Sequence, residues 1–155
     1  MHAVCCNGRG ADRPNRNRVK ERAGIMLKNP VRVFIVDDSP YLRDMLCELL
    51  SDPGTIDIVG TGESALTAVE DVKLLNADVV IIDLQLKGGS GFDVVKGIRL
   101  LPRAKDIITI IFTNHASPAL HAHALTLGAD YFLDKSNDHD KVVAILQEKV
   151  RSHET

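Results

Sequence analysis

The sequence is poor in long apolar runs and in cysteine, and each shortage excludes a class of protein. No stretch approaches the ~20 apolar residues that a membrane-spanning helix needs, and residues 1–25 lack the apolar segment of a secretory signal. The three cysteines are Cys5, Cys6 and Cys47. An adjacent pair does not have the spacing of a metal knuckle, and an odd, sparse set is no disulfide framework. These absences predict a protein of the reducing cytoplasm.

The composition is that of one globular domain with an uneven distribution of charge. The chain has 155 residues, of which 45% are apolar and 26% charged, and such proportions exclude a disordered chain. A chain of this length can bury a sizeable core without disulfide staples. Residues 1–30 hold seven Lys or Arg and two Asp or Glu, whereas residues 31–155 hold twelve and nineteen. The acidic body argues against direct nucleic-acid binding by the folded domain.

The first 30 residues are rich in arginine and asparagine and show almost no apolar periodicity. Such a segment cannot bury enough apolar surface to offset the entropy of ordering. We therefore expect a disordered basic extension over residues 1–30 and a folded domain over residues 31–152. Three interpretations of the extension stay open: an arm that contacts nucleic acid or an acidic partner, a tail without a role, and a start codon placed too early, with Met26 as the true start.

From Val31 onward, short apolar runs alternate with helical patterns. Runs rich in β-branched residues predict strands at 31–36, 56–60, 78–82, 107–112 and 131–133. Amphipathic spacing with Ser-Pro or Gly boundaries predicts helices at about 40–51, 63–75, 92–101, 118–127 and 138–151. The strands are continuous apolar runs, which is typical of a parallel sheet buried on both faces. The sequence therefore predicts a doubly wound α/β fold with ligands at the carboxyl ends of its strands.

Apolar spacing also predicts which helix faces are buried. The expected stripes are Leu42, Met45, Leu46 and Leu49 in the first helix and Leu66, Val69 and Lys73 or Leu74 in the second. We expect Cys47 to pack just off the first stripe. We expect His115, His121 and His123 on the surface, because positions 121 and 123 do not share a helix face. Residues 88–91 resemble a phosphate loop but lack its GK[ST] ending, and are expected to form a flexible loop.

Polar residues follow the predicted strands at their carboxyl ends: Asp37 and Asp38, Asp83, Thr113 and Lys135. In a doubly wound sheet these positions converge on one edge. Three neighbouring carboxylates repel one another, and Mg²⁺ relieves that repulsion while keeping room for waters and a phosphate. A lysine and a hydroxyl suit phosphoryl oxygens. Each residue alone has an ordinary explanation, as a turn former, a helix cap or a solvated lysine. Together and in this order they predict a site for a phosphoryl group on or beside a carboxylate.

These residues and their flanks resemble the receiver domains of two-component response regulators. The matching stretches are VDDSPYLRDML after the first strand, DLQLKGGSGFDVVKGIR after the third and GADYFLDK before the lysine, and the resemblance covers about residues 31–151. It implies a flavodoxin-like, five-stranded parallel sheet of order 2-1-3-4-5 with helices on both faces. It also implies a cytoplasmic signal-transduction protein of the stand-alone type, which is not an enzyme but assists its own phosphorylation and dephosphorylation.

The resemblance also implies roles for individual residues. Asp83 corresponds to the phosphoacceptor, which takes a phosphoryl group from a phosphohistidine of a sensor histidine kinase or a histidine phosphotransferase. Lys135 and the hydroxyl of Thr113 would hold the phosphoryl oxygens, and Thr113 with Phe132 would form the conformational switch. The implied Mg²⁺ ligands, direct or through water, are Asp37, Asp38, Asp83 and the backbone carbonyl of Gln85.

Two positions depart from the family pattern. Lys87 stands four residues after Asp83, where the family often has proline, and Ser136 follows Lys135, where it usually has proline after a cis bond. A cis bond before a non-proline residue costs roughly 3 kcal/mol more than a trans bond. The loop after Lys135 therefore either keeps a strained cis bond or takes another path.

The chain ends about four residues after the last predicted helix, and from this we expect no DNA-binding or enzyme domain. The expected output is a contact between a downstream protein and the face of the fourth helix, fifth strand and fifth helix. Two roles stay open: a chemotaxis-type regulator that binds another assembly, or an intermediate that passes the phosphoryl group onward to a histidine phosphotransferase. Alternatives on the same topology are a Mg²⁺-dependent phosphohydrolase, which needs D-x-D where this chain has Asp37-Asp38-Ser39, and a nucleotide- or flavin-binding protein, which needs a Gly- or Ser/Thr-rich turn there.

Overall fold

The sheet of the computed structural model, which describes residues 26–154, is parallel and five-stranded. Its strands are β1 (Val31–Val36), β2 (Ile56–Gly62), β3 (Val79–Ile82), β6 (Ile108–Thr113) and β7 (Tyr131–Asp134). Their order is β2-β1-β3-β6-β7, and every neighbouring pair is parallel. Counted along the chain, this is the doubly wound order 2-1-3-4-5. The predicted fold class is confirmed, and each strand begins and ends within about two residues of its expected position.

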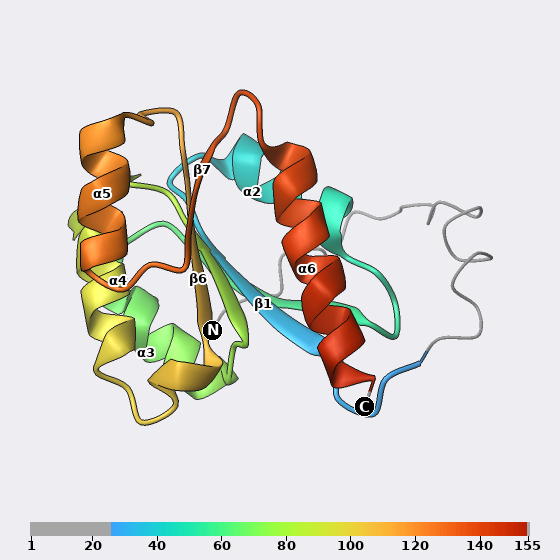
Figure 1. Ribbon diagram of the computed structural model, residues 1–155. Coiled ribbons are helices and arrows are strands. Elements are labelled where there is room, and N and C mark those ends of the chain that lie inside the picture. Colours follow the sequence, from blue (N-terminus) through green and yellow to red (C-terminus); the bar gives the residue numbers. More distant parts are fainter. Residues whose placement is uncertain (1–25, 155) are drawn as a thin grey trace.

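Helices cover both faces of the sheet (Figure 1). α2 (Pro40–Leu50) and α6 (His139–His153) lie on one face, and α3 (Ala65–Leu75), α4 (Gly91–Arg99) and α5 (Pro118–Thr126) lie on the other. A short 3-10 helix, Ala104–Asp106, precedes β6. The hydroxyls of Ser39, Ser64, Ser90 and Ser117 each accept a hydrogen bond from a first-turn N–H, because those donors have no partner within the helix. Among the described residues, no helix is both long and apolar enough to cross a membrane.

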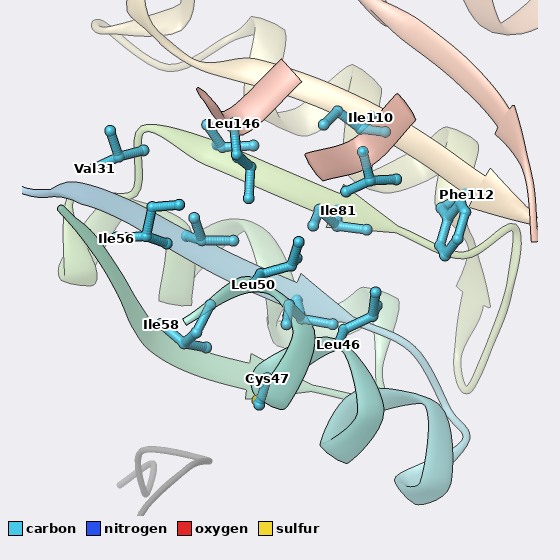
Figure 2. Close-up of a cluster of buried hydrophobic side chains, with 14 of the residues drawn as sticks. Val31, Leu46, Cys47, Leu50, Ile56, Ile58, Ile81, Ile110, Phe112 and Leu146 are labelled. Atoms are coloured by element: carbon cyan, nitrogen blue, oxygen red, sulfur yellow. The ribbon is translucent and has the colours of Figure 1, made fainter. Parts of the chain in front are cut away.

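Buried apolar side chains form one cluster on each face of the sheet. The first cluster lies between the sheet and the helices α2 and α6, and Figure 2 shows part of it, including Val31, Leu46, Leu50, Ile81, Phe112 and Leu146. The second lies under α3, α4 and α5. Along β1, Val33 and Ile35 enter the first cluster, whereas Phe34 and Val36 enter the second. Successive side chains of a strand point to opposite faces, so a strand buried on both faces reads as an unbroken apolar run.

The buried face of α2 lies slightly off the predicted stripe. Leu46, Cys47 and Leu50 are buried, whereas Leu42, Met45 and Leu49 are only partly buried against the same cluster. Cys47 therefore packs in the core, closer to the centre of the buried face than expected.

The predicted apolar stripe of α3 is wrong. Leu66 is 79% exposed and Leu74 67% exposed, while Ala68 and Val72 are fully buried against the sheet. Val69 instead faces α4, where a Cβ on Gly97 would lie 2.5 Å from a Val69 methyl. The absence of a side chain at Gly97 lets the two helices approach closely, and that contact turns α3 so that its smaller residues meet the sheet.

The segment after β3 is a small antiparallel hairpin where the sequence predicted a flexible loop. β4 (Gln85–Leu86) pairs with β5 (Gly89–Ser90), with Gln85 opposite Ser90 and Leu86 opposite Gly89. Gly88 takes a φ of 71° at the turn, a backbone conformation open to glycine at little cost. Ser90 and Asp93 then form a capping box at the start of α4, which joins the hairpin to a helix.

The ordered fold begins before Val31, earlier than the expected boundary. The N–H of Leu27 donates to the carbonyl of Gly54 at 2.9 Å, and His153 Nδ1 lies 2.8 Å from the carbonyl oxygen of Asn29. Leu27 also packs against the first cluster. Residues 26–30 therefore belong to the folded part. The remainder of the expected basic extension, residues 1–25, lies outside the described residues.

Candidate functional site

The polar residues singled out in the sequence meet at the carboxyl edge of the sheet. Asp37 follows β1, Asp83 follows β3, Thr113 ends β6 and Lys135 follows β7. Backbone hydrogen bonds between neighbouring strands fix their relative heights: the N–H of Asp83 donates to the carbonyl of Val36 at 2.9 Å, and the N–H of Lys135 donates to that of Thr113 at 3.0 Å. Parallel pairing thus brings together side chains that lie up to about a hundred positions apart in the chain.

Lys135 bridges two of the carboxylates. Its Nζ lies 2.7 Å from Asp37 Oδ2 and 3.2 Å from Asp83 Oδ2. The Lys135 side chain is 8% exposed, and Asp83 and Asp37 are also buried. Charges removed from water in this way need a close partner of opposite sign. The ammonium group therefore compensates two carboxylates that would otherwise repel each other.

Three acidic side chains form a cluster suited to a divalent cation. One carboxylate oxygen from each of Asp37, Asp38 and Asp83 lies within 4.8 Å of the other two. All are hard oxygen donors, the chemistry that Mg²⁺ prefers, and Asp38 is exposed and keeps the cluster open to water. The backbone of Gln85 lowers the pKa of Asp83, which places the start of β4 beside the cluster. The residues present fit a magnesium ion.

Burial raises the pKa of Asp83 above its ordinary value, and the neighbouring charge of Asp37 raises it further. The ion pair with Lys135 and the N–H of Gln85 act in the opposite direction but do not cancel these effects. A carboxylate that is hard to ionise and lies beside a second acid gains from a nearby cation. The electrostatics of the site therefore favour the binding of additional positive charge.

The raised pKa predicts the effect of neutralising Asp83 on stability. A group whose pKa is raised in the folded state contributes stability below its unfolded pKa, and that contribution is lost as pH rises through the folded value. In metal-free buffer, Asp83→Asn should therefore raise the free energy of unfolding at pH 7. Urea unfolding at several pH values measures the difference in free energy of unfolding between the variant and wild type. That difference should shrink as pH falls towards 4. A variant less stable than wild type at pH 7 would contradict this.

Thr113 and Phe132 occupy the side of the site that faces α5. Thr113 is fully buried, and its Oγ1 accepts a hydrogen bond from the N–H of His115 at 3.1 Å. The Phe132 ring is half-buried and stacks on His121, with ring centroids 5.1 Å apart. Figure 1 places β7, which carries Phe132, between α5 and α6. His115, His121 and His123 are exposed, as expected.

The sequence left open whether the loop after Lys135 keeps a strained cis bond or takes another path, and the loop takes another path. Every peptide bond of the described residues is trans, including the one between Lys135 and Ser136. Two aspartates shape the turn: Asp134 accepts a hydrogen bond from the N–H of Ser136 at 2.8 Å, and Asp138 accepts one from the N–H of Asp134 at 2.8 Å. Side-chain acceptors of this kind stabilise tight turns, so Lys135 reaches the site without a proline after it.

Sequence reasoning missed several contacts that hold the site in place. Arg43, one turn into α2, donates from its guanidinium to the carbonyl of Asp37 at 2.6 Å, and the N–H of Ser39 donates to Asp37 Oδ1 at 2.9 Å. Lys87, the first departure from the family pattern, pairs with Glu63 at 2.8 Å. The Ser39 contact is a local turn formed by an aspartate two residues earlier, a pattern that the sequence itself shows, whereas nothing in the sequence linked Lys87 to Glu63.

A doubly wound sheet with three acids and a buried lysine at its carboxyl edge defines a phosphoacceptor domain of the α/β class. The chain belongs to the response regulator receiver domain family, whose model matches residues 33–147. It therefore functions as a receiver in two-component signalling. The match favours this function over the phosphohydrolase and the nucleotide- or flavin-binding protein.

Curated relatives are longer proteins. The chain is 40% identical over 111 residues to protein-glutamate methylesterase/protein-glutamine glutaminase 1 of Xanthomonas campestris pv. campestris, covering 70% of this chain and 30% of that protein. It is 34% identical over 100 residues to the protein-glutamate methylesterase/protein-glutamine glutaminase of Rhizobium etli, covering 64% and 28%. The chain thus spans less than a third of the relatives' length, and the activities in their names belong to the whole proteins.

Solved structures of similar fold are response regulators. The response regulator domain of Thermotoga maritima CheB has a TM-score of 0.66 and 26% identity, covering 81% of this chain and 96% of that chain. A LuxR-family response regulator from Aurantimonas sp. SI85-9A1 has a TM-score of 0.71 and 26% identity, covering 80% and 87%. The fold and the family assignment agree over nearly all of the described residues.

Proposed function

We propose that Asp83 accepts a phosphoryl group from a phosphohistidine. One Asp83 carboxylate oxygen attacks the phosphorus, the phosphorus–nitrogen bond breaks, and its electron pair returns to the imidazole of the donor. The product is an aspartyl phosphate. The observation that carries this proposal is the position of the buried Asp83 carboxylate, 3.2 Å from Lys135 Nζ and within the acidic cluster. Such a reaction depends on positioning and charge neutralisation rather than on further covalent chemistry.

The proposed metal ligands are Asp37, Asp38, Asp83 and the backbone carbonyl of Gln85. Bound there, Mg²⁺ supplies positive charge that neutralises the phosphoryl oxygens as they approach the acids. Asp37 is held ready by Ser39 and Arg43, and Asp38 lies exposed beside it. The chain's own carboxylates thus carry out the binding, and their mutual repulsion disfavours phosphoryl entry when no cation is present.

Lys135 and Thr113 would hold the phosphoryl oxygens once the group is on Asp83. The Lys135 ammonium already contacts the Asp83 carboxylate and can donate to a phosphoryl oxygen as a point charge. The Thr113 hydroxyl accepts from His115, and its own O–H has no acceptor among the described residues. A buried donor without an acceptor gains a hydrogen bond when an anionic oxygen arrives.

The partner that supplies the phosphoryl group is, in this proposal, a sensor histidine kinase or a histidine phosphotransferase. The receiver region itself would assist its own phosphorylation and dephosphorylation without acting as an enzyme on other substrates. The test is incorporation of phosphate from acetyl phosphate with and without Mg²⁺, followed by transfer from purified histidine phosphotransfer domains. Mg²⁺-dependent labelling at Asp83 supports the proposal, and labelling elsewhere overturns it.

The output surface we propose is the face formed by α5, β7 and α6. Leu125 of α5 and Tyr131 of β7 are exposed apolar residues on it, and the Phe132 ring of β7 stacks on His121 of α5. When a phosphoryl oxygen draws the Thr113 hydroxyl inward, space opens beneath α5 into which the Phe132 ring can turn. The surface presented to a downstream protein then changes.

Phe132 should exchange between two positions before phosphorylation. A phenylalanine ring that turns inward buries no polar group. A tyrosine ring that turns inward buries a hydroxyl, which then needs a hydrogen-bond partner. Relaxation-dispersion NMR on the unphosphorylated protein should therefore show exchange at Phe132 and along residues 120–127, and Phe132→Tyr should populate the inward state less. A single static ring position, together with a Phe132→Tyr variant that switches as readily as wild type, would contradict this prediction.

A further inference from the structure

The outer side of the β4–β5 hairpin is fastened to the loop before α3 by three contacts at one residue. The N–H of Lys87 donates to the carbonyl of Glu63 at 3.1 Å, and the N–H of Ala65 donates to the carbonyl of Lys87 at 2.8 Å. The Lys87 ammonium also pairs with Glu63 Oε1 at 2.8 Å. Both the backbone and the side chain of Lys87 are therefore anchored to the segment between β2 and α3.

The inner side of the hairpin is held by α4. The N–H of Gly91 donates to the carbonyl of Leu84 at 2.9 Å, and Ser90, opposite Gln85 in the hairpin, caps α4 together with Asp93. The hairpin is thus fastened on both sides, and Gln85 lies between the two attachments. Its position relative to the acidic cluster depends on both.

The exposed Leu66 completes the outer attachment. A Cβ at Gly88 would lie 2.8 Å from Leu66 Cγ, so this leucine packs directly over the hairpin turn. This contact explains why a large apolar side chain at the start of α3 faces away from the core. The outer attachment therefore combines an apolar contact, two backbone hydrogen bonds and one ion pair.

The ion pair is suited to setting position more than to adding stability. The side chains of Lys87 and Glu63 are 65% and 47% exposed, and exposed pairs contribute little to the free energy of unfolding. The hydrogen bond and the charge of Lys87 lower the pKa of Glu63, so the pair favours the ionised form of the Glu63 carboxyl. Loss of the pair would remove the charged contact of the outer attachment and leave its two backbone hydrogen bonds and the Leu66 contact.

We propose that Glu63 and Lys87 are a positioning pair that holds the hairpin strand carrying Gln85 in place beside the acidic cluster and so raises the affinity of the site for Mg²⁺. This inference rests on the proposed function, because it assumes that the cluster binds Mg²⁺ with the help of the Gln85 carbonyl. It adds two residues that do not touch the metal, the phosphoryl group or Asp83.

Calorimetric titration of the full chain with MgCl₂ at low ionic strength tests the pair. Glu63→Gln and Lys87→Met should each weaken Mg²⁺ binding about threefold, the scale on which exposed ion pairs act. The difference should fade as salt is raised, because exposed charges are screened. The double exchange Glu63→Lys with Lys87→Glu should restore affinity, and the melting temperature should change little in all three. Glu148→Gln is the matched control, since it removes the exposed pair with Arg151 on α6.

The outcomes separate this inference from the proposed function. If wild type binds Mg²⁺ and Glu63→Gln binds it equally well at low salt, the positioning role is wrong and the proposed function stands. Equal weakening in Glu148→Gln would also overturn the positioning role, because the effect would then be one of net charge. If wild type does not bind Mg²⁺, the proposed metal site fails first, and the inference fails with it.

Discussion

Asp83→Asn is expected to abolish phosphorylation of the chain. With acetyl phosphate and Mg²⁺, wild type should take up one acid-stable but hydroxylamine-sensitive phosphoryl group, and the variant should take up none. The reason is chemical: the amide of asparagine lacks the anionic oxygen that attacks phosphorus, while its size and shape preserve the surrounding contacts. Asp83 is buried, its carboxylate contacts Lys135, and it lies beside Asp37 and Asp38.

A matched control keeps this result specific. Asp57→Asn replaces an exposed aspartate of the edge strand β2 and should leave labelling unchanged. Omitting Mg²⁺ should suppress labelling of wild type, because three carboxylates without a cation repel the incoming group. Mass spectrometry after hydroxylamine treatment locates the label. Persistent labelling of Asp83→Asn would show that another side chain is the acceptor.

Lys135→Met should cause the largest loss of stability of any single change at the site. The variant leaves Asp37 and Asp83 buried side by side without the cation that now lies 2.7 Å and 3.2 Å from them. Removing one partner of a buried ion pair costs about 3 kcal/mol, because the remaining charges have neither water nor a counter-ion. Urea unfolding at pH 7 in metal-free buffer should show this deficit. Phosphorylation should also fall strongly.

The pH dependence of Lys135→Met provides an independent check. Lys135 lowers the pKa of Asp83, so its removal raises that pKa further. The protonated acid carries no charge to compensate, and the deficit should therefore be largest at neutral pH and shrink as pH falls through the raised pKa. The double variant Lys135→Met with Asp83→Asn should lose less stability than Lys135→Met alone, because only one buried carboxylate remains.

An exposed lysine serves as the control for charge and side-chain loss. Lys141→Met removes an exposed lysine that pairs with Asp138 at 3.3 Å on α6 and should change the free energy of unfolding by less than about 0.5 kcal/mol. A Lys135→Met variant as stable as Lys141→Met at pH 7 would mean that water or counter-ions already compensate the acid pair. The electrostatic account of the site would then be wrong.

The sequence by itself determined the elements and the acceptor edge. Runs such as VRVFIV and IITIIF are apolar at five of their six positions, and a strand buried on both faces of a parallel sheet accommodates such a run. Ser-Pro pairs at Ser39 and Ser117 marked helix starts through the local chemistry of capping. Asp37, Asp83 and Lys135 were identifiable because parallel strands bring their carboxyl ends to one edge. These are short-range signals, or direct consequences of strand direction.

Only the tertiary structure decided how neighbouring elements face one another. Apolar spacing predicted a stripe through Leu66 and Val69 in α3, whereas Val69 packs closely against Gly97 of α4 and Ala68 and Val72 face the sheet. The pairing of Lys87 with Glu63 joins residues in separate loops. The raised pKa of Asp83 arises from burial and from Asp37 on another strand. Each of these depends on distances across the fold, and such distances leave no local pattern in the chain.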